Sequence, residues 1–144
     1  MAGDTTVSVF DITASGLSAE RARMEVIAAN VANANATRDV NGEPYRRKEV
    51  VFSTAYQDAL GQANQHSSGV KVVGVRTDST PFREVYQPGH PDAGEDGILL
   101  LPNVHLSNEF VDLITASRGY EANLKVMRSF QDMASNAIEL LRRM

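Results

Sequence analysis

The chain contains no cysteine, and nowhere do eighteen apolar residues follow one another. The lack of cysteine excludes thiol catalysis, disulfides and Cys-ligated metal sites. A membrane-spanning helix needs about 20 mostly apolar residues, so the sequence predicts no direct spanning of a membrane. The first residues also lack a basic segment followed by an apolar one. We therefore expect no cleaved secretory signal peptide.

Charge of one sign is not concentrated anywhere in the sequence. The 14 basic and 18 acidic residues give a net charge of −4 and are spread along all 144 residues. A nucleic-acid-binding chain usually carries a clustered basic patch, so nucleic acid is not expected as a partner. The hydrophobic content of 42% is sufficient for a folded core.

The last forty residues show the strongest pattern in the sequence. Apolar residues recur there at alternating steps of four and three, and no proline falls between Asn103 and Met144. This predicts one continuous helix about 60 Å long. The seam comprises Leu106, Phe110, Leu113, Ser117, Tyr120, Leu124, Met127, Gln131, Ala134, Ile138 and Leu141. Such a helix is too long to bury its whole seam within this chain, so a function in assembly is indicated.

The first forty residues repeat this pattern. Phe10, Leu17, Met24 and Val31 are spaced by seven, and a second amphipathic helix is therefore predicted. Ala14, Ile27 and Ala28 fill the same face. A capping box of Ser8 and Asp11 predicts that this helix begins near Val7 or Ser8. It should end among Asn30, Asn33 and Asn35, because asparagine competes for main-chain hydrogen bonds.

The middle of the chain has a β-like character. Residues 46–56 and 69–78 read as strands, and 98–101 read as a further short strand. The polar stretch 57–68 is typical of a mobile loop, and 88–97, rich in proline, glycine and acid, of a surface loop.

These elements predict a mainly α fold with a small β-rich insert. The long terminal helices are expected to pair as an antiparallel coiled coil. Residues 1–37 and 103–144 would then form a discontinuous helical core domain. Residues 38–102 would form a central β-rich outer domain with loops.

Candidate chemistry in the acidic loop is weak. Asp92, Asp96 and Gly97 match three positions of a calcium loop. However, Gly94 lies at a position that needs an oxygen ligand, and Asn103 lies at the position that needs a bidentate glutamate. A divalent-ion cluster would comprise His90, Asp92, Glu95 and Asp96, although such clusters are usually solvated charge.

No catalytic motif is present either. The three histidines, His66, His90 and His105, lie far apart, and no Walker loop, GxSxG or GxGxxG occurs. Neither an enzyme nor a cofactor or metal site is expected.

The string SRGYEAN within the long helix has two interpretations. Arg118 and Glu121 lie three residues apart on one face and can simply form an ion pair. Alternatively, Tyr120 and Asn123 fix the register of a helical bundle by directional hydrogen bonds. Gly119 costs about 1 kcal/mol in a helix relative to alanine, so it should serve the close approach of a neighbour.

Three strings together resemble the axial proteins of the bacterial flagellum, the family of rod and hook subunits. They span residues 8–37, 91–104 and 109–130. The first is similar to the family's N-terminal helix, with its asparagine element at Asn30, Asn33 and Asn35. The third carries the family's R-x-Y-x-x-N motif at Arg118, Tyr120 and Asn123. The segment TRDVNGEPYRRKEVVF, the PDAGEDG loop and the short length resemble the proximal-rod members in particular.

The resemblance implies a structural subunit of the basal-body rod that polymerises through its terminal helices into a torque-transmitting drive shaft. Implied partners are further copies, other rod proteins, the inner-membrane ring, rod-adaptor proteins and the type III export apparatus. The implied location is the rod in the periplasm, after export without a signal peptide. The predicted interface residues are Phe10, Leu17, Met24, Asn30, Val31, Asn33, Asn35, Phe110, Leu113, Arg118, Tyr120, Asn123, Leu124 and Met127.

Three alternatives remain open at the level of sequence. The nearest is another rod or hook subunit. A cytoplasmic coiled-coil adaptor or secretion chaperone would share the heptads, and a metal-dependent hydrolase is the weakest possibility.

Overall fold

Two long helices dominate the structure, with four short strands between them in sequence. The computed structural model describes residues 2–38, 42–54 and 69–143. The elements are α1 (Ala2–Ala32), β1 (Lys48–Thr54), β2 (Val70–Thr77), β3 (Arg83–Tyr86), β4 (Ile98–Leu101) and α2 (Leu106–Arg143). The expectation of a mainly α chain with a small β-rich middle is confirmed. The loop predicted at 57–68 lies outside the described residues.

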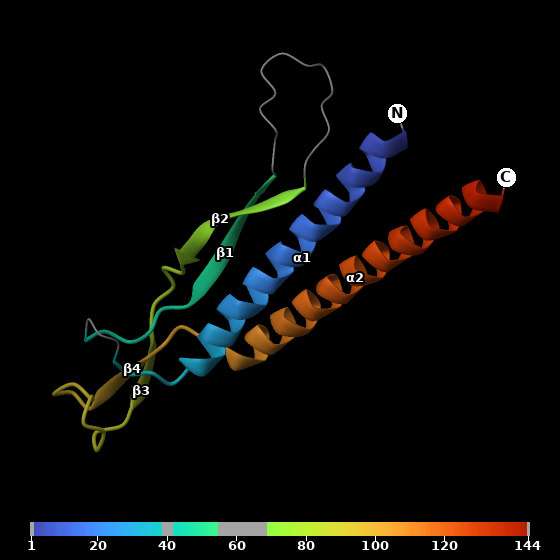
Figure 1. Ribbon diagram of the computed structural model, residues 1–144. Helices are drawn as coiled ribbons and strands as arrows, with labels where there is room; N and C mark the ends of the chain where they lie inside the picture. The colour runs from blue at the N-terminus through green and yellow to red at the C-terminus, as the bar shows by residue number, and fades with distance from the viewer. Residues whose placement is uncertain (1, 39–41, 55–68, 144) are drawn as a thin grey trace, which may run out of the picture.

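The helices α1 and α2 lie side by side and run antiparallel, so that both termini lie at the same end of the molecule (Figure 1). The rings of Phe10 and Phe130 meet edge to face near that end, with centroids 6.5 Å apart. Arg23 and Asp112 lie 3.5 Å apart nearer the other end. The antiparallel pairing is therefore as predicted, while coiled-coil geometry stays a prediction.

The predicted end of α1 and the predicted continuous course of α2 are confirmed. The helix α1 ends at Ala32, where Asn33 Nδ2 donates to the carbonyl of Ala29 at 2.8 Å, and α2 is continuous over 38 residues. The predicted start of α1 near Val7 or Ser8 is wrong, because the helix begins at Ala2. No proline interrupts residues 2–7, and a helix that has nucleated extends at little cost.

The strands form two separate antiparallel ribbons. In the first, β1 pairs with β2, and a bulge interrupts the register between Val51 and Phe52. In the second, β3 pairs with β4, from Arg83 opposite Leu101 to Tyr86 opposite Ile98. The strand β3 was not predicted. Its four residues are too short for a clear alternation, and the ladder offered by β4 gives them a strand conformation.

The β1–β2 hairpin packs on α1, and the β3–β4 ribbon lies at the end of the molecule away from the termini (Figure 1). The backbone N–H of Val70 donates to Ser15 Oγ at 3.1 Å, which ties the hairpin to the helix. Gly69 makes this approach possible, because a Cβ there would lie 2.1 Å from Ser15 Oγ.

The buried core is small and sits where the helix pair meets the strands. Ala34, Tyr45 and Val104 form its cluster, and Leu99 on β4 is also buried. Among the described residues, no helix combines the length and apolarity that a membrane crossing requires.

Candidate functional site

Besides the Phe10–Phe130 contact, the two helices approach each other closely at small and polar residues. A Cβ at Gly16 would lie 2.9 Å from Asn123 Nδ2, and a Cβ at Gly119 would lie 3.1 Å from Glu20 Oε1. Each glycine therefore accepts a polar side chain of the opposite helix. The close approach expected at Gly119 is confirmed. Within the described part of the chain, the buried Oε2 of Glu20 has no hydrogen-bond partner.

The contact line of α1 differs from the predicted apolar seam. Gly16, Arg23 and Asn30 face α2, whereas Leu17, Met24 and Val31 are half-buried on one flank of that line. The contact line therefore lies beside Leu17, Met24 and Val31, although Phe10 of the same seam meets Phe130 of α2. The physical reason is that α1 must contact both the hairpin and α2, two surfaces about 90° apart around its axis.

The same shift occurs in α2. Glu109, Ala116 and Asn123 lie on its contact side, so Phe110, Ser117 and Leu124 follow them by one position on the flank. In each helix, this flank consists of residues one position after the contact residues. Because the helices are antiparallel, the two flanks lie on the same side of the helix pair. Hairpin contacts such as Ser15 precede the contact line of α1 and lie on the other side.

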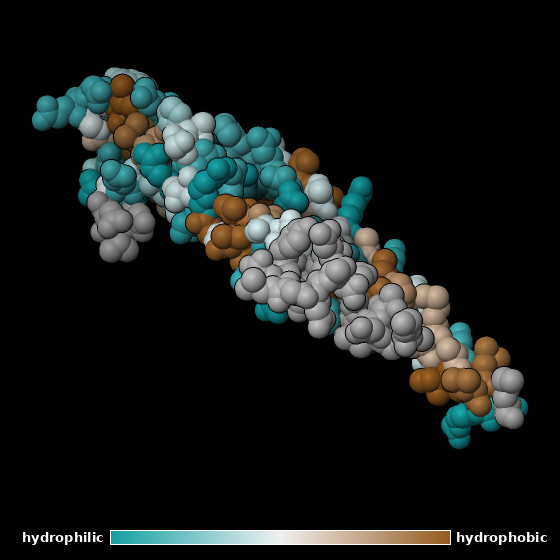
Figure 2. All heavy atoms as spheres, turned by 90° about the horizontal axis from the view of Figure 1, so that it is seen from above, coloured by the Kyte–Doolittle hydropathy of each residue, from teal (hydrophilic) through white to brown (hydrophobic). Residues whose placement is uncertain are grey.

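Part of each predicted seam therefore lies on one surface of the helix pair, opposite the hairpin. We call this surface the open face and define it by Leu17, Met24, Val31, Phe110, Ser117 and Leu124. Phe110 is 50% exposed, and the remaining five are half-buried. Beyond α1, the end of α2 exposes Ile138, Leu140 and Leu141. Hydrophobic side chains gather at this end in the space-filling view (Figure 2).

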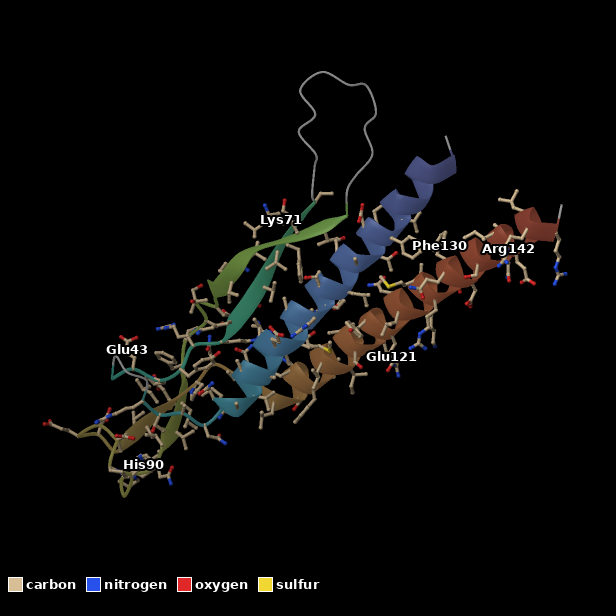
Figure 3. The ribbon with its side chains drawn as sticks, viewed as in Figure 1. Glu43, Lys71, His90, Glu121, Phe130 and Arg142 are labelled. Carbon is tan, nitrogen blue, oxygen red and sulfur yellow. The ribbon has the colours of Figure 1, made fainter. Side chains whose placement is uncertain are left out.

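Other predicted interface residues lie elsewhere on the helix pair. Leu113, Tyr120 and Met127 are half-buried, while Arg118 and Asn35 are exposed. In the described residues no ion pair joins Arg118 to Glu121. Phe10 meets Phe130, which Figure 3 shows on α2. The role of all these residues in assembly stays a prediction.

A buried group of polar residues joins both helices to the strands, and we call it the polar junction (Asn30, Tyr45, Arg47, Asn103, Glu109). Asn30 and Glu109 are fully buried, and Asn30 Nδ2 donates to Glu109 Oε2 at 3.0 Å. The hydroxyl of Tyr45 donates to Asn30 Oδ1 at 3.0 Å. The same amide also pairs with the N–H and C=O of Lys48, both at 2.9 Å. Asn30 thus connects α1, α2 and β1.

Arg47 supplies the positive charge of the polar junction. Its Nε donates to Glu109 Oε1 at 2.6 Å, and its Nη1 contacts Glu49. Burial lowers the pKa of Arg47, but its hydrogen bonds and charge interactions with Glu109 and Glu49 outweigh this effect and raise the pKa. The guanidinium therefore stays charged. A buried carboxylate such as Glu109 needs a charged partner of this kind.

Asn103 performs the same role for the second ribbon. Its Oδ1 accepts the backbone N–H of Arg47 at 2.8 Å, and its Nδ2 donates to the carbonyl of Thr80 at 3.2 Å. The amides of Asn103 and Asn30 therefore hold two consecutive residues, Arg47 and Lys48, at the start of β1.

The acidic loop is held by internal contacts. Asp92 pairs with Arg38 at 2.8 Å, and its carboxylate accepts a hydrogen bond from the hydroxyl of Thr37 at 2.8 Å. Over the ranges that the structure describes, no group of three potential ligand side chains is placed to hold a metal ion.

Two family models match the parts of the chain that build this arrangement. The model described as "Flagella basal body rod protein" matches residues 10–38, and "Flagellar basal body rod FlgEFG protein C-terminal" matches residues 95–140. The protein named "Flagellar basal-body rod protein FlgC" from Yersinia enterocolitica is 39% identical over 134 residues, which cover 93% of this chain and 96% of the relative. The chain belongs to the FlgC family. It is a structural subunit of the flagellar basal-body rod.

Relatives from distant bacteria extend the match to the FlgC family. The protein of the same name from Bacillus subtilis is 37% identical over 147 residues, covering 94% of this chain and 98% of the relative. The one from Borreliella burgdorferi is 35% identical over 146 residues, covering 93% and 96%. The resemblance to proximal-rod members is thereby confirmed.

Asn30 was predicted as an interface residue, but the other members of the polar junction were missed by reasoning from the sequence. Asn30, Asn103 and Glu109 fall within the two matched regions, whereas Tyr45 and Arg47 lie between them. One available signal was Glu109, whose carboxylate lies directly before the seam residue Phe110. Two helices of one chain that pack together have their interface in this region. The partner of Glu109 is Arg47, 62 residues away in sequence, so only the fold reveals the pair.

Proposed function

We propose that the chain polymerises into the rod through the open face of its helix pair. The observation that carries this proposal is the placement of part of each apolar seam on one surface that the chain itself covers only in part. Burying such a surface against neighbouring subunits stabilises the assembled state by about 25 cal/mol per Å² of apolar area. Phe110, half exposed in the single chain, is a natural anchor.

The finer features of the proposal follow from the family. Residues 1–37 and 103–144 would form the helical core of the rod, paired as a coiled coil, and 38–102 an outer domain. The rod would transmit torque across the periplasm and contact the inner-membrane ring and rod-adaptor proteins. The subunit would arrive through the type III export apparatus. A catalytic role is not proposed.

The substitution Leu124→Asp tests the open face. It places a charge on the surface to be buried, which costs several kcal/mol without a partner in the assembly. We expect loss of swimming at an unchanged cellular level of the protein, measured by motility in soft agar and immunoblotting. Lys125→Asp is the matched control, because it introduces the same carboxylate at the next, exposed position.

Two outcomes would contradict the proposal. Normal swimming of the Leu124→Asp strain would exclude the open face as an essential interface. Mass spectrometry of detergent-extracted basal bodies provides the second test. Enrichment of the wild-type chain beside ring components is expected, whereas recovery only in the cytosol would favour the adaptor alternative.

A further inference from the structure

The β1–β2 hairpin is a ribbon of two strands that lies along α1 (Figure 1). Within the described elements, its two strands pack against each other and against α1, and against no other helix or strand. A ribbon of two strands has little stability of its own, and no third strand fixes its direction. Its contacts with α1 therefore decide how it is placed on the helix pair.

The side chain of Asn30 pairs with β1 as a neighbouring strand would. Its Oδ1 accepts the backbone N–H of Lys48, and its Nδ2 donates to the carbonyl of the same residue, both at 2.9 Å. Successive residues of a strand direct these groups to opposite edges. The carbonyl of Arg47, one position earlier, accepts the N–H of Asp78 across the ribbon at 2.8 Å. Asn30 therefore binds the outer edge of β1, on the side away from β2.

Two neighbours fix the direction in which the amide of Asn30 points. Its Nδ2 donates to Glu109 Oε2 at 3.0 Å, and its Oδ1 accepts the hydroxyl of Tyr45 at 3.0 Å. Because a carboxylate only accepts hydrogen bonds, the NH₂ group must face Glu109, and Oδ1 then faces the N–H of Lys48. The amide is therefore held in the orientation that matches the edge of β1.

Ser15 holds the other end of the ribbon through β2. The backbone N–H of Val70 donates to Ser15 Oγ at 3.1 Å, and Ser15 Oγ donates to the carbonyl of Ile12 at 2.7 Å. Val70 is the first residue of β2, and its cross-strand partner Thr54 is the last residue of β1. The contacts of Asn30 and Ser15 therefore lie at opposite ends of the ribbon and on different strands.

The spacing of the two contacts matches the length of the ribbon. The stretch of α1 from Ser15 to Asn30 is about 22 Å long. The strand β1, from Lys48 to Thr54, extends about 20 Å. A single contact would let the ribbon rotate about that point, whereas two contacts at its ends determine one angle between the ribbon and the helix.

We propose that Asn30 and Ser15 are positioning residues that fix the angle of the hairpin on α1, so that every rod subunit carries its hairpin in one orientation. Asn30 is 0% exposed, so it serves assembly through β1 and not by touching a neighbouring subunit. The inference rests on the proposed function, in which the helix pair forms the core of the rod and the middle of the chain its outer domain.

The test is the distance between two spin labels in the purified full chain, measured by double electron–electron resonance. The chain has no cysteine, so the labels attach only at introduced cysteines. Lys71→Cys on the hairpin and Glu121→Cys on α2 form the reporting pair, since both positions are exposed (Figure 3). Ala28→Cys with Glu121→Cys is the control pair, because both positions lie on the helices. Both pairs should give one narrow distance.

The substitution Ser15→Ala removes the acceptor of the Val70 N–H and leaves the contact of Asn30 in place. We expect the reporting pair to lose its narrow distance, because the ribbon then rotates about its remaining contact, while the control pair keeps its distance. Ser18→Ala is the matched control, an exposed serine on the same helix, and should change neither pair.

The substitution Asn30→Asp places a carboxylate oxygen against two acceptors, the carbonyl of Lys48 and the carboxylate of Glu109. Combining it with Glu109→Gln lets the new amide donate to the new carboxylate, which restores the hydrogen bond between the helices but not the one to Lys48. In the combined variant we expect the control pair to keep the wild-type distance and the reporting pair to stay broad. A residue that only stabilises the helix pair would restore both.

Swimming in soft agar connects the angle of the hairpin to the rod. At equal cellular levels of the protein, the Ser15→Ala strain should form a smaller swimming ring than the Ser18→Ala strain. Equal rings would overturn the link between hairpin angle and assembly. An unchanged narrow distance of the reporting pair in Ser15→Ala, or in the combined Asn30→Asp and Glu109→Gln variant, would overturn the positioning role of that residue. Absence of the wild-type chain from basal bodies would overturn the proposed function but leave the label distances as they are, so the two failures are distinguishable.

Discussion

At the scale of single residues, the polar junction explains how a chain with a small core fixes its architecture. Glu109 is fully buried and holds hydrogen bonds from Asn30 at 3.0 Å and Arg47 at 2.6 Å. Buried ion pairs contribute little net stability, because desolvation of both charges offsets their attraction. We infer that the junction instead determines which residues of α1, α2 and β1 meet.

The substitution Arg47→Gln should be strongly destabilising. It leaves the carboxylate of Glu109 buried without its cation, which costs about 2 to 4 kcal/mol. Denaturant unfolding of the purified chain measures this loss. Arg76→Gln is the control, because that arginine is 72% exposed in its pair with Glu49 and should change the free energy of unfolding by less than about 1 kcal/mol. Equal effects of the two variants would contradict a special role of the junction.

At the scale of elements, the docking of the hairpin on α1 depends on one backbone position. Gly69 has a φ of +97° and lies against Ser15 and the backbone of Ile12. A side chain at this position would meet both a strained conformation and a steric clash. The approach of β2 to α1 therefore requires glycine there.

The variant Gly69→Ala should destabilise the chain by about 1 to 3 kcal/mol, whereas Gly74→Ala should be close to neutral. Gly74 is the matched control, since it lies within β2, does not have a positive φ, and a Cβ at this position would have no neighbouring atom within 4 Å. Thermal unfolding followed by circular dichroism compares the two. A larger loss for Gly74→Ala would show that the hairpin docks differently.

At the scale of the whole molecule, the chain is an extended body whose helices leave much apolar surface uncovered. Eighteen large hydrophobic residues are exposed, while only seven hydrophobic residues are buried among those described. A single chain of this shape is marginally stable. Burial of its apolar surface against neighbouring subunits adds the stabilisation that its small core does not provide.

The stability of the chain should fall on acidification. Hydrogen bonds from Arg76 and then Arg47 lower the pKa of Glu49 below its ordinary 4.5, and hydrogen bonds from Thr80 lower the pKa of Asp78 below 3.8. Because both values are lower in the folded state, the stabilisation is present above the unfolded values and is lost as pH falls through the folded ones.

The measurement is the Tm of the purified chain between about pH 6 and pH 3. We expect a decline that sets in near the ordinary carboxylate values and a shallower decline for Glu49→Gln. A Tm that is independent of pH over this range would contradict the role of these carboxylates.

The sequence alone determined the elements whose signals are local and long. The heptads and the absence of proline predicted α2 and its uninterrupted course. The asparagines after residue 29 predicted the end of α1, and alternating valines predicted β1 and β2. It also determined the family, because the motifs at both ends of the chain are contiguous strings.

Only the tertiary structure decided which faces of the helices meet. Periodicity identifies an apolar stripe, but part of each seam flanks the contact line, where Gly16, Asn30 and Glu109 lie. Their place depends on glycine contacts and on ion pairs between residues such as Arg47 and Glu109, 62 positions apart. Interactions over such separations leave no periodic trace in the sequence, so the polar junction and the open face emerge only when the chain is folded.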